Sequence, residues 1–331
     1  MPVSIGVDIG GTKVLAAVVD HTGRVLDTEA TDTPGQGAGL ERATVREVED
    51  ALVDVVSPLL AIHGRAPVGV AAAGFVDRDA QRVRFAPHLP WRDEPLSARL
   101  TERLGHRILG DVLVDNDATA ALWAEAHFGA ARLVRDAVMV TLGTGIGGGL
   151  MVRGALHRGT NGMAGEYGHM QVVPDGRPCQ CGQRGCWEQY CSGNALTRAA
   201  LDGGLELAGA PLTTAAREGD MVALAAYEQV GHWLGVGVAN LVAAFDPPLV
   251  VVGGGVSAAS DLLLDRARKS LAETLVGSGF RDLPELVGAE LGPLAGVVGI
   301  ADLARTAGRI RRVGRWGRAP SRVARGKARR R

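Results

Sequence analysis

Four cysteines and one histidine lie close together in the sequence, with a spacing that could bind a metal ion. They are His169, Cys179, Cys181, Cys186 and Cys191. Glycines at positions 182 and 185 allow the tight turns that bring several sulfur atoms together. A tetrahedral zinc site needs four ligands, and either all four cysteines or three of them with the histidine would supply these. The pattern therefore predicts a zinc site and leaves the choice between these two ligand sets open.

An alternative for the same cysteines is a disulfide framework. The N-terminus, MPVSIGVDIGG, lacks the pattern of a secretion signal, and no stretch has the roughly 18 uninterrupted apolar residues of a membrane span. We therefore expect a cytoplasmic protein with no membrane partner, in a compartment that keeps thiols reduced. Clustered cysteines there are more typical of metal sites than of disulfides. Cys191 fits a small buried apolar residue at least as well as it fits a ligand.

Glycine turns between apolar runs form a second group of residues that could serve a chemical function. DIGGTK at 8–13 and GTGIGGG at 143–149 each stand between two such runs. Backbone N–H groups in turns of this kind can converge on an anion, and glycine lets a phosphate approach without meeting a Cβ atom. Neither segment has the P-loop pattern or the usual setting of a dinucleotide fold. Two such turns facing each other predict a polyphosphate site of another kind.

Carboxylates at the ends of apolar runs form the third group. Asp8 ends the first run, where a carboxylate needs a partner, and magnesium bound through water is a suitable one. Asp115, Asn116 and Asp117 follow another run and precede an alanine-rich helical segment. They could cap that helix. A carboxylate at this point could also be the general base for a hydroxyl group, with the neighbouring amide orienting the substrate.

The elements expected around these residues are strands and helices in two lobes, because 331 residues exceed the usual size of a single core. Residues 3–30 and 137–160 both favour an antiparallel meander, so one supersecondary unit occurs twice. The segment LVVVGGGVS, 249–257, predicts a strand that ends in glycines, which suits a nucleoside base and ribose. The apolar helical run at 222–247 is expected in the core, with small residues that permit close packing, and part of a subunit interface is the alternative.

Composition and charge restrict the partners of the chain. Hydrophobic residues make up 46% and charged residues 22%, as in globular proteins. The 36 basic residues equal the 36 acidic residues, so the whole molecule offers no strong field to nucleic acid. Residues 313–331 are strongly basic and contain no acids, and we expect a disordered tail there.

Taken in order, these segments resemble the ROK family (repressors, open reading frames, kinases) of the actin-like ATPase superfamily, and in particular its sugar kinases of the glucokinase type. The resemblance runs from Val3 to about Ala307. DIGGTK resembles the first phosphate loop, VDNDATAAL the segment of the catalytic base, GTGIGGG the second phosphate loop and GGGVS the adenosine segment. The most specific match is GEYGH followed by CQCGQRGCWE, which is similar to the family's zinc signature.

The resemblance implies an α/β, two-lobed actin-like ATPase (ribonuclease H-like) fold, with mixed sheets flanked by helices and the active site in the cleft between the lobes. The small lobe would comprise residues 1–116 and 299–312, with the first phosphate loop and part of the sugar pocket. The large lobe would comprise residues 117–298, with the catalytic base, the second phosphate loop, the zinc site and the adenosine segment.

The resemblance also implies a reaction and residues that serve it. The γ-phosphate of Mg-ATP would pass to the 6-hydroxyl of glucose, with Asp117 as the general base. The sugar-binding residues would be Gly74, Asn116, Asp117, Glu166, His169 and Glu188. The residues for ATP and Mg²⁺ would be Asp8, Gly10, Gly11, Thr12, Lys13, Thr144, Gly145, Gly254 and Gly255. A structural Zn²⁺ would be bound by His169, Cys179, Cys181 and Cys186, which leaves Cys191 as a packing residue.

Other functions stay open within the family. Ala73 precedes Gly74 where relatives commonly have proline, and His88 replaces an asparagine in the loop APHLPW, so a kinase for mannose, fructose or an N-acetylhexosamine is an alternative. The family also contains sugar-responsive repressors with a winged helix-turn-helix ahead of the DIGGT strand. Here that strand begins at Ser4, which favours an enzyme. The resemblance further favours a homodimer or homotetramer.

Overall fold

A five-stranded mixed sheet is formed by the N-terminal part of the chain. The computed structural model describes residues 3–35 and 43–313. The strands are β1 (Ser4–Ile9), β2 (Lys13–Val19), β3 (Val25–Asp32), β4 (Val68–Ala72) and β8 (Leu113–Asn116), in the order β3-β2-β1-β4-β8. β1, β2 and β3 form an antiparallel meander, as the sequence predicted, and β4 and β8 run parallel to β1.

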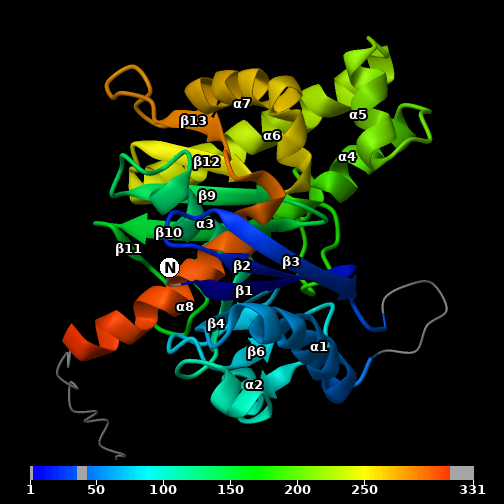
Figure 1. Cartoon of the computed structure of the whole chain (residues 1–331). Helices are drawn as coiled ribbons and strands as arrows, with labels where there is room; N and C mark the ends of the chain where they lie inside the picture. Colours follow the sequence, from blue (N-terminus) through cyan, green and yellow to red (C-terminus); the bar gives the residue numbers. More distant parts are fainter. Residues whose placement is uncertain (1–2, 36–42, 314–331) are drawn as a thin grey trace, which may run out of the picture.

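Two helices and a small sheet complete this part of the molecule (Figure 1). The helices are α1 (Val45–His63) and α2 (Leu96–Leu104), and the small sheet contains β5 (Phe75–Val76), β6 (Val83–Phe85) and β7 (Arg92–Glu94). α1 begins at a capping box, in which Thr44 and Glu47 exchange side-chain and backbone hydrogen bonds. The valines and leucines on one face of α1 pack with β1 and β4 in one hydrophobic core.

A second five-stranded sheet repeats the topology of the first. Its strands are β9 (Ala137–Leu142), β10 (Ile146–Val152), β11 (Ala155–Leu156), β12 (Leu249–Gly253) and β13 (Glu285–Gly288), in the order β11-β10-β9-β12-β13. β9, β10 and β11 form the antiparallel meander, and β12 and β13 run parallel to β9. The sequence prediction of one supersecondary unit used twice is therefore confirmed.

Four helices contribute to the core on one side of the second sheet. They are α4 (Gly193–Asp202), α5 (Gly209–Arg217), α6 (Met221–Phe245) and α7 (Ser260–Thr274). α6 and α7 lie over the sheet in Figure 1. Glycines on α6 permit their close approach, because a Cβ atom at Gly235 would lie 2.3 Å from the carbonyl oxygen of Ala267. The predicted core position of α6 is thus confirmed.

Two further helices, α3 (Asp117–Phe128) and α8 (Ala295–Val313), lie between the sheets (Figure 1). They cross in close contact, since a Cβ atom at Gly299 would lie 1.8 Å from the carbonyl oxygen of Ala120. α8 also packs on the first sheet, where Gly6 approaches the carbonyl oxygen of Val297. Because α8 contacts both halves of the molecule, the lobe boundaries at 116 and 299 stay a proposal.

The expectation of mixed sheets flanked by helices is confirmed. Of the basic segment 313–331, only Val313 falls within the described residues, so the prediction of a disordered tail lies outside them. No helix in 3–35 or 43–313 is both long enough and apolar enough to span a membrane.

Candidate active site

The carboxyl ends of three parallel strands bring several predicted site residues to one edge of the first sheet. β1 pairs with β4 at Ile9 and Ala72, and β4 pairs with β8 at Ala72 and Asn116. The turn at 10–12 and Gly74 follow two of these strand ends directly. The glycine turn, Gly74, which was predicted to bind the sugar, and the candidate base therefore share one edge, as the strand pattern requires.

Asn116 organises the candidate base. Its side-chain oxygen accepts a hydrogen bond from the backbone N–H of Thr119 at 3.0 Å and so caps α3. Its side-chain Nδ2 donates to Oδ1 of Asp117 at 2.9 Å and to the carbonyl oxygen of Gly74 at 3.2 Å. The backbone N–H of Ala118 also donates to Oδ1 of Asp117, at 2.9 Å. The Asp117 carboxylate is thus held in one orientation, with Oδ2 outside these contacts.

Several carboxyl groups near this edge are harder to ionise than usual. Loss of hydration raises the pKa of Asp117. Loss of hydration, reinforced by the charge of Asp117, raises the pKa of Asp8 to about 7. Loss of hydration, with the charges of Asp117 and Glu188, raises the pKa of Glu166 to about 7. These carboxyl groups therefore interact electrostatically, and perturbed groups gathered in this way are typical of active sites.

The second edge carries the other glycine turns. Thr141 in β9 pairs with Gly253 in β12, so the turns that follow these strands lie side by side. A Cβ atom at Gly254 would lie 2.5 Å from the carbonyl oxygen of Leu142, which explains why a glycine follows β12. Thr144 is exposed at this edge. The exposed backbone at these turns is accessible to a ligand.

Glu188 links the glycine turn at 143–145, which we call the second glycine turn, to the cysteine segment, residues 179–191. It lies in a short 3₁₀ helix, Trp187–Gln189, and is buried. A Cβ atom at Gly145 would lie 2.4 Å from Oε2 of Glu188, so a larger residue at this position would displace the Glu188 carboxylate. The other oxygen, Oε1, accepts from Sγ of Cys179 at 3.0 Å and lies 3.8 Å from Nδ1 of His169.

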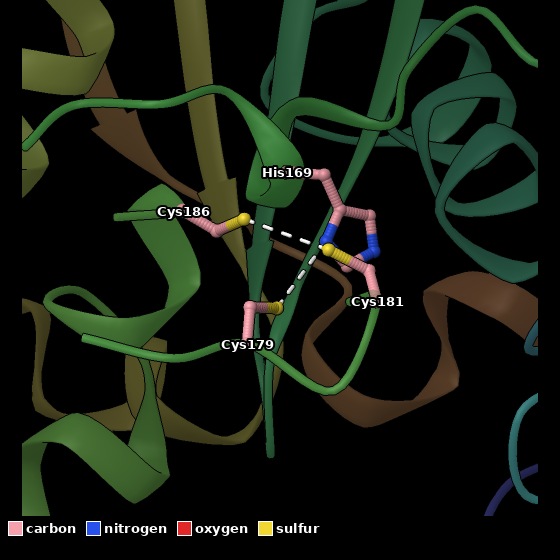
Figure 2. Close-up of side chains that lie close together, drawn as sticks. All are labelled: His169, Cys179, Cys181 and Cys186. Atoms are coloured by element: carbon pink, nitrogen blue, oxygen red, sulfur yellow. Dashed lines mark hydrogen bonds between the residues drawn. The ribbon is translucent and has the colours of Figure 1, made fainter. Parts of the chain in front are cut away.

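The predicted zinc ligands form one cluster, shown in Figure 2. Its ligand atoms, from His169, Cys179, Cys181 and Cys186, all lie within 4.8 Å of one another. Sγ of Cys179 is 3.8 Å from Nδ1 of His169, and the Sγ atoms of Cys181 and Cys186 are 3.6 Å apart. Zinc with bonds of about 2.3 Å to sulfur gives tetrahedral edges of about 3.8 Å. The four donors therefore have the chemistry and the spacing of a zinc site.

The fourth cysteine has a different environment. Cys191 is fully buried in the hydrophobic core that the second sheet forms with helices α4–α7, and burial raises the pKa of its thiol. All four cysteines are free thiols. The 3.6 Å between the sulfur atoms of Cys181 and Cys186 far exceeds the roughly 2.05 Å of a disulfide bond. The arrangement favours the ligand set with His169 over the set of four cysteines.

Sequence reasoning missed one contact beside the candidate base. The guanidinium of Arg158 binds both carboxylate oxygens of Asp115, the residue that we considered as a helix cap. The sequence gives little indication of this contact, because a single arginine in the glycine-containing segment HRGTNG matches no pattern of spacing.

Two sheets of repeated topology, with glycine turns at their edges and a helix pair between them, define the actin-like ATPase fold. The sequence profile of the ROK family matches residues 4–307, and the chain belongs to this family. The family prediction is confirmed.

Comparisons with individual proteins narrow the position within the family. The glucokinase of Streptomyces coelicolor is 42% identical, in an alignment that covers 92% of this chain and 98% of that protein. The glucokinase of Thermotoga maritima is 34% identical, with 90% and 96% covered. The crystal structure of a ROK family glucokinase from Streptomyces griseus, in complex with glucose and AMPPNP, matches with a TM-score of 0.81 and 42% identity, over 92% of this chain and 99% of that one.

Proposed function

We propose that this chain is an ATP-dependent glucokinase that transfers the γ-phosphate of Mg-ATP to the 6-hydroxyl of glucose. The observation that carries the proposal is the carboxylate of Asp117, oriented by Asn116 at the sheet edge that also holds Gly74. A whole-length relationship to a protein named glucokinase, at 42% identity, supports glucose as the substrate. The Streptomyces griseus structure, with glucose and AMPPNP bound, supports the use of ATP.

In this proposal the protein positions the reactants and stabilises charge. Asp117 accepts the proton of the sugar hydroxyl through Oδ2, because Oδ1 is occupied by hydrogen bonds from Asn116 and Ala118. Glu166, His169 and Glu188 hold the sugar ring. The backbone of Gly10, Gly11, Thr12, Lys13, Thr144 and Gly145 contacts the phosphates, Gly254 and Gly255 contact the adenosine, and Asp8 lies near Mg²⁺.

Zinc has a structural role in this proposal. His169, Cys179, Cys181 and Cys186 hold the ion, and when bound it fixes the segment between them without supplying a reacting group. Glu188 contacts this cluster through Oε1 and reaches Gly145 through Oε2. A fixed cysteine segment therefore supports the sugar site and the second glycine turn together.

The wider setting rests on the sequence. A cytoplasmic location, a role in carbohydrate metabolism such as glycolysis, and a homodimer or homotetramer remain proposals. The absence of nucleic acid among the partners is likewise a proposal.

Initial rates of ADP release with Mg-ATP and a panel of sugars test the substrate. We expect glucose to give a larger kcat/KM than mannose, fructose, N-acetylglucosamine or N-acetylmannosamine. A larger value for an N-acetylated sugar would overturn glucose as the substrate and keep the kinase. If no sugar stimulates ADP release, the kinase proposal itself is wrong.

The raised pKa values predict a loss of activity on the acid side. The reaction needs Asp117 ionised, and loss of hydration raises its pKa, so its inactive protonated form accumulates at a higher pH than for an ordinary aspartate. We expect kcat/KM for glucose to fall on the acid side, because burial raises the pKa of Asp117 and raises that of Glu166, which holds the sugar in this proposal, to about 7. The measurement is kcat/KM against pH at saturating Mg-ATP. A profile that stays flat down to about pH 5 would contradict the prediction.

A further inference from the structure

An ion pair between Arg158 and Asp115 joins the two sheets behind the candidate base. Asp115 lies in β8 of the first sheet, and Arg158 follows β11 of the second. Nε of Arg158 lies 3.2 Å from Oδ1 and 3.0 Å from Oδ2 of Asp115, and Nη2 also contacts Oδ2. The Asp115 side chain is 2% exposed and that of Arg158 is 23% exposed. A buried carboxylate bound by a planar guanidinium has a narrowly defined orientation.

From Asp115, hydrogen bonds lead to the base. Oδ1 of Asp115 also accepts from the backbone N–H of Asn116 at 3.0 Å. The side chain of Asn116 then donates to Oδ1 of Asp117 at 2.9 Å. Arg158 therefore acts on the backbone of the residue that orients the base, and it is separated from that base by two intermediate residues.

On the other side of the ion pair, a backbone hydrogen bond connects Arg158 to the segment that precedes Glu166. The carbonyl oxygen of Arg158 accepts from the backbone N–H of Ala164 at 3.1 Å, two residues before Glu166. This bond closes the segment into a compact loop, which we call the 158–166 loop. At Gly162 the loop meets β5, because a Cβ atom there would lie 2.0 Å from the carbonyl oxygen of Val76. The bond between Arg158 and Ala164 couples the position of Arg158 to the segment that leads to Glu166.

We propose that Arg158 is a positioning residue, whose ion pair with Asp115 keeps the Glu166 carboxylate in a fixed position relative to the Asp117 carboxylate. The inference rests on the proposed function, in which Glu166 holds the sugar and Asp117 accepts its proton. Arg158 acts through Asp115 and the 158–166 loop. Lysine at this position keeps the charge but lacks the planar guanidinium that binds both oxygens. It therefore fixes the position of Glu166 relative to Asp117 less tightly, without leaving Asp115 buried and unpaired.

The test compares Arg158→Lys with the wild type in steady-state kinetics. We expect kcat/KM for the sugar to fall by about 10- to 100-fold, with a lower kcat and a higher sugar KM, because a displacement of about 1 Å is enough for such a loss. The KM for ATP stays within about twofold, since the loop carries no residue of the proposed phosphate turns. If Arg158 served only stability, the variant would not raise the KM for sugar while leaving the KM for ATP unchanged.

Three further variants extend the comparison. Asp115→Asn is expected to show the same loss, and the double variant with Arg158→Lys is expected to lose little more than either single one, because both changes weaken the same interaction between Asp115 and residue 158. Arg268→Lys is the matched control, since Arg268 pairs with Asp265 at 2.9 Å on the exposed surface of α7. It is expected to behave as the wild type.

Amide hydrogen exchange gives a readout that does not depend on the substrate. We expect the amides of the 158–166 loop, Ala164 above all, to exchange at least about tenfold faster in Arg158→Lys, with helices α6 and α7 unchanged. If the wild type phosphorylates no sugar, the proposed function fails, and the exchange experiment still decides the positioning role. The inference is overturned if loop exchange is unchanged, if sugar kcat/KM stays within about threefold of the wild type, or if the KM for ATP rises as much as that for sugar.

Discussion

The Asp117→Asn variant is expected to lose about 10²- to 10⁴-fold in kcat for glucose, while its affinity for glucose changes little. Asparagine has nearly the same shape as aspartate, and its side-chain oxygen can still accept the hydrogen bonds that Asn116 and Ala118 donate. It cannot accept the proton of the sugar hydroxyl. The measurement pairs single-turnover rates in Mg-ATP with glucose binding by calorimetry in the absence of nucleotide.

The stability of this variant separates a chemical defect from misfolding. Because the folded protein raises the pKa of Asp117, it disfavours the charged carboxylate relative to the unfolded chain, and a neutral side chain removes that cost at neutral pH. We therefore expect Tm to stay the same or to rise. Asp265→Asn, on the exposed surface of α7, is the matched control and should keep full activity. Loss of glucose binding with retained turnover would refute the role of Asp117 as base.

Much of the fold was predictable because it depends on local patterns. The two meanders follow from alternating apolar runs and glycine turns at 8–13 and 143–149, and the structure contains both. The segment 249–257 was read as a strand that ends in glycines, and β12 ends there. Less visible in the sequence was the position of α8, because its glycines at 296 and 299 matter only through contacts with distant segments.

The site was predictable where one motif contains several of its residues. The candidate zinc cluster has three of its four donors within 179–186, and the candidate base Asp117 stands beside Asn116, which orients it. Contacts between distant segments gave no such signal. Asp115 pairs with Arg158 across 43 positions, and Gly145 meets Glu188 through a carboxylate oxygen. The first contact depends on how the two sheets are placed, and the second on how the 3₁₀ helix Trp187–Gln189 packs on the turn after β9. Spacing along the chain encodes neither.

The Cys186→Ser variant is expected to contain no zinc, to lose more than about 100-fold in kcat/KM for glucose, and to melt at least about 5 °C lower than the wild type. Cys186 is fully buried in the cluster, and serine is a poor ligand for zinc. Without the ion, the segment that carries Glu188 loses its anchor. Since Glu188 also packs on Gly145, the KM for ATP should rise with that for glucose. This joint loss distinguishes the variant from Arg158→Lys.

Metal analysis of the purified wild type, with about one zinc per chain expected, is the first measurement. Cys191→Ser is the control, because Cys191 is equally buried but lies in the hydrophobic core outside the ligand cluster. It should keep its zinc and its KM for ATP, although a buried hydroxyl lowers Tm. Incubation with a chelator should reproduce the Cys186→Ser phenotype in the wild type, and returned zinc should reverse it. A wild-type protein free of zinc, with full activity retained in Cys186→Ser, would remove the metal from the proposed function.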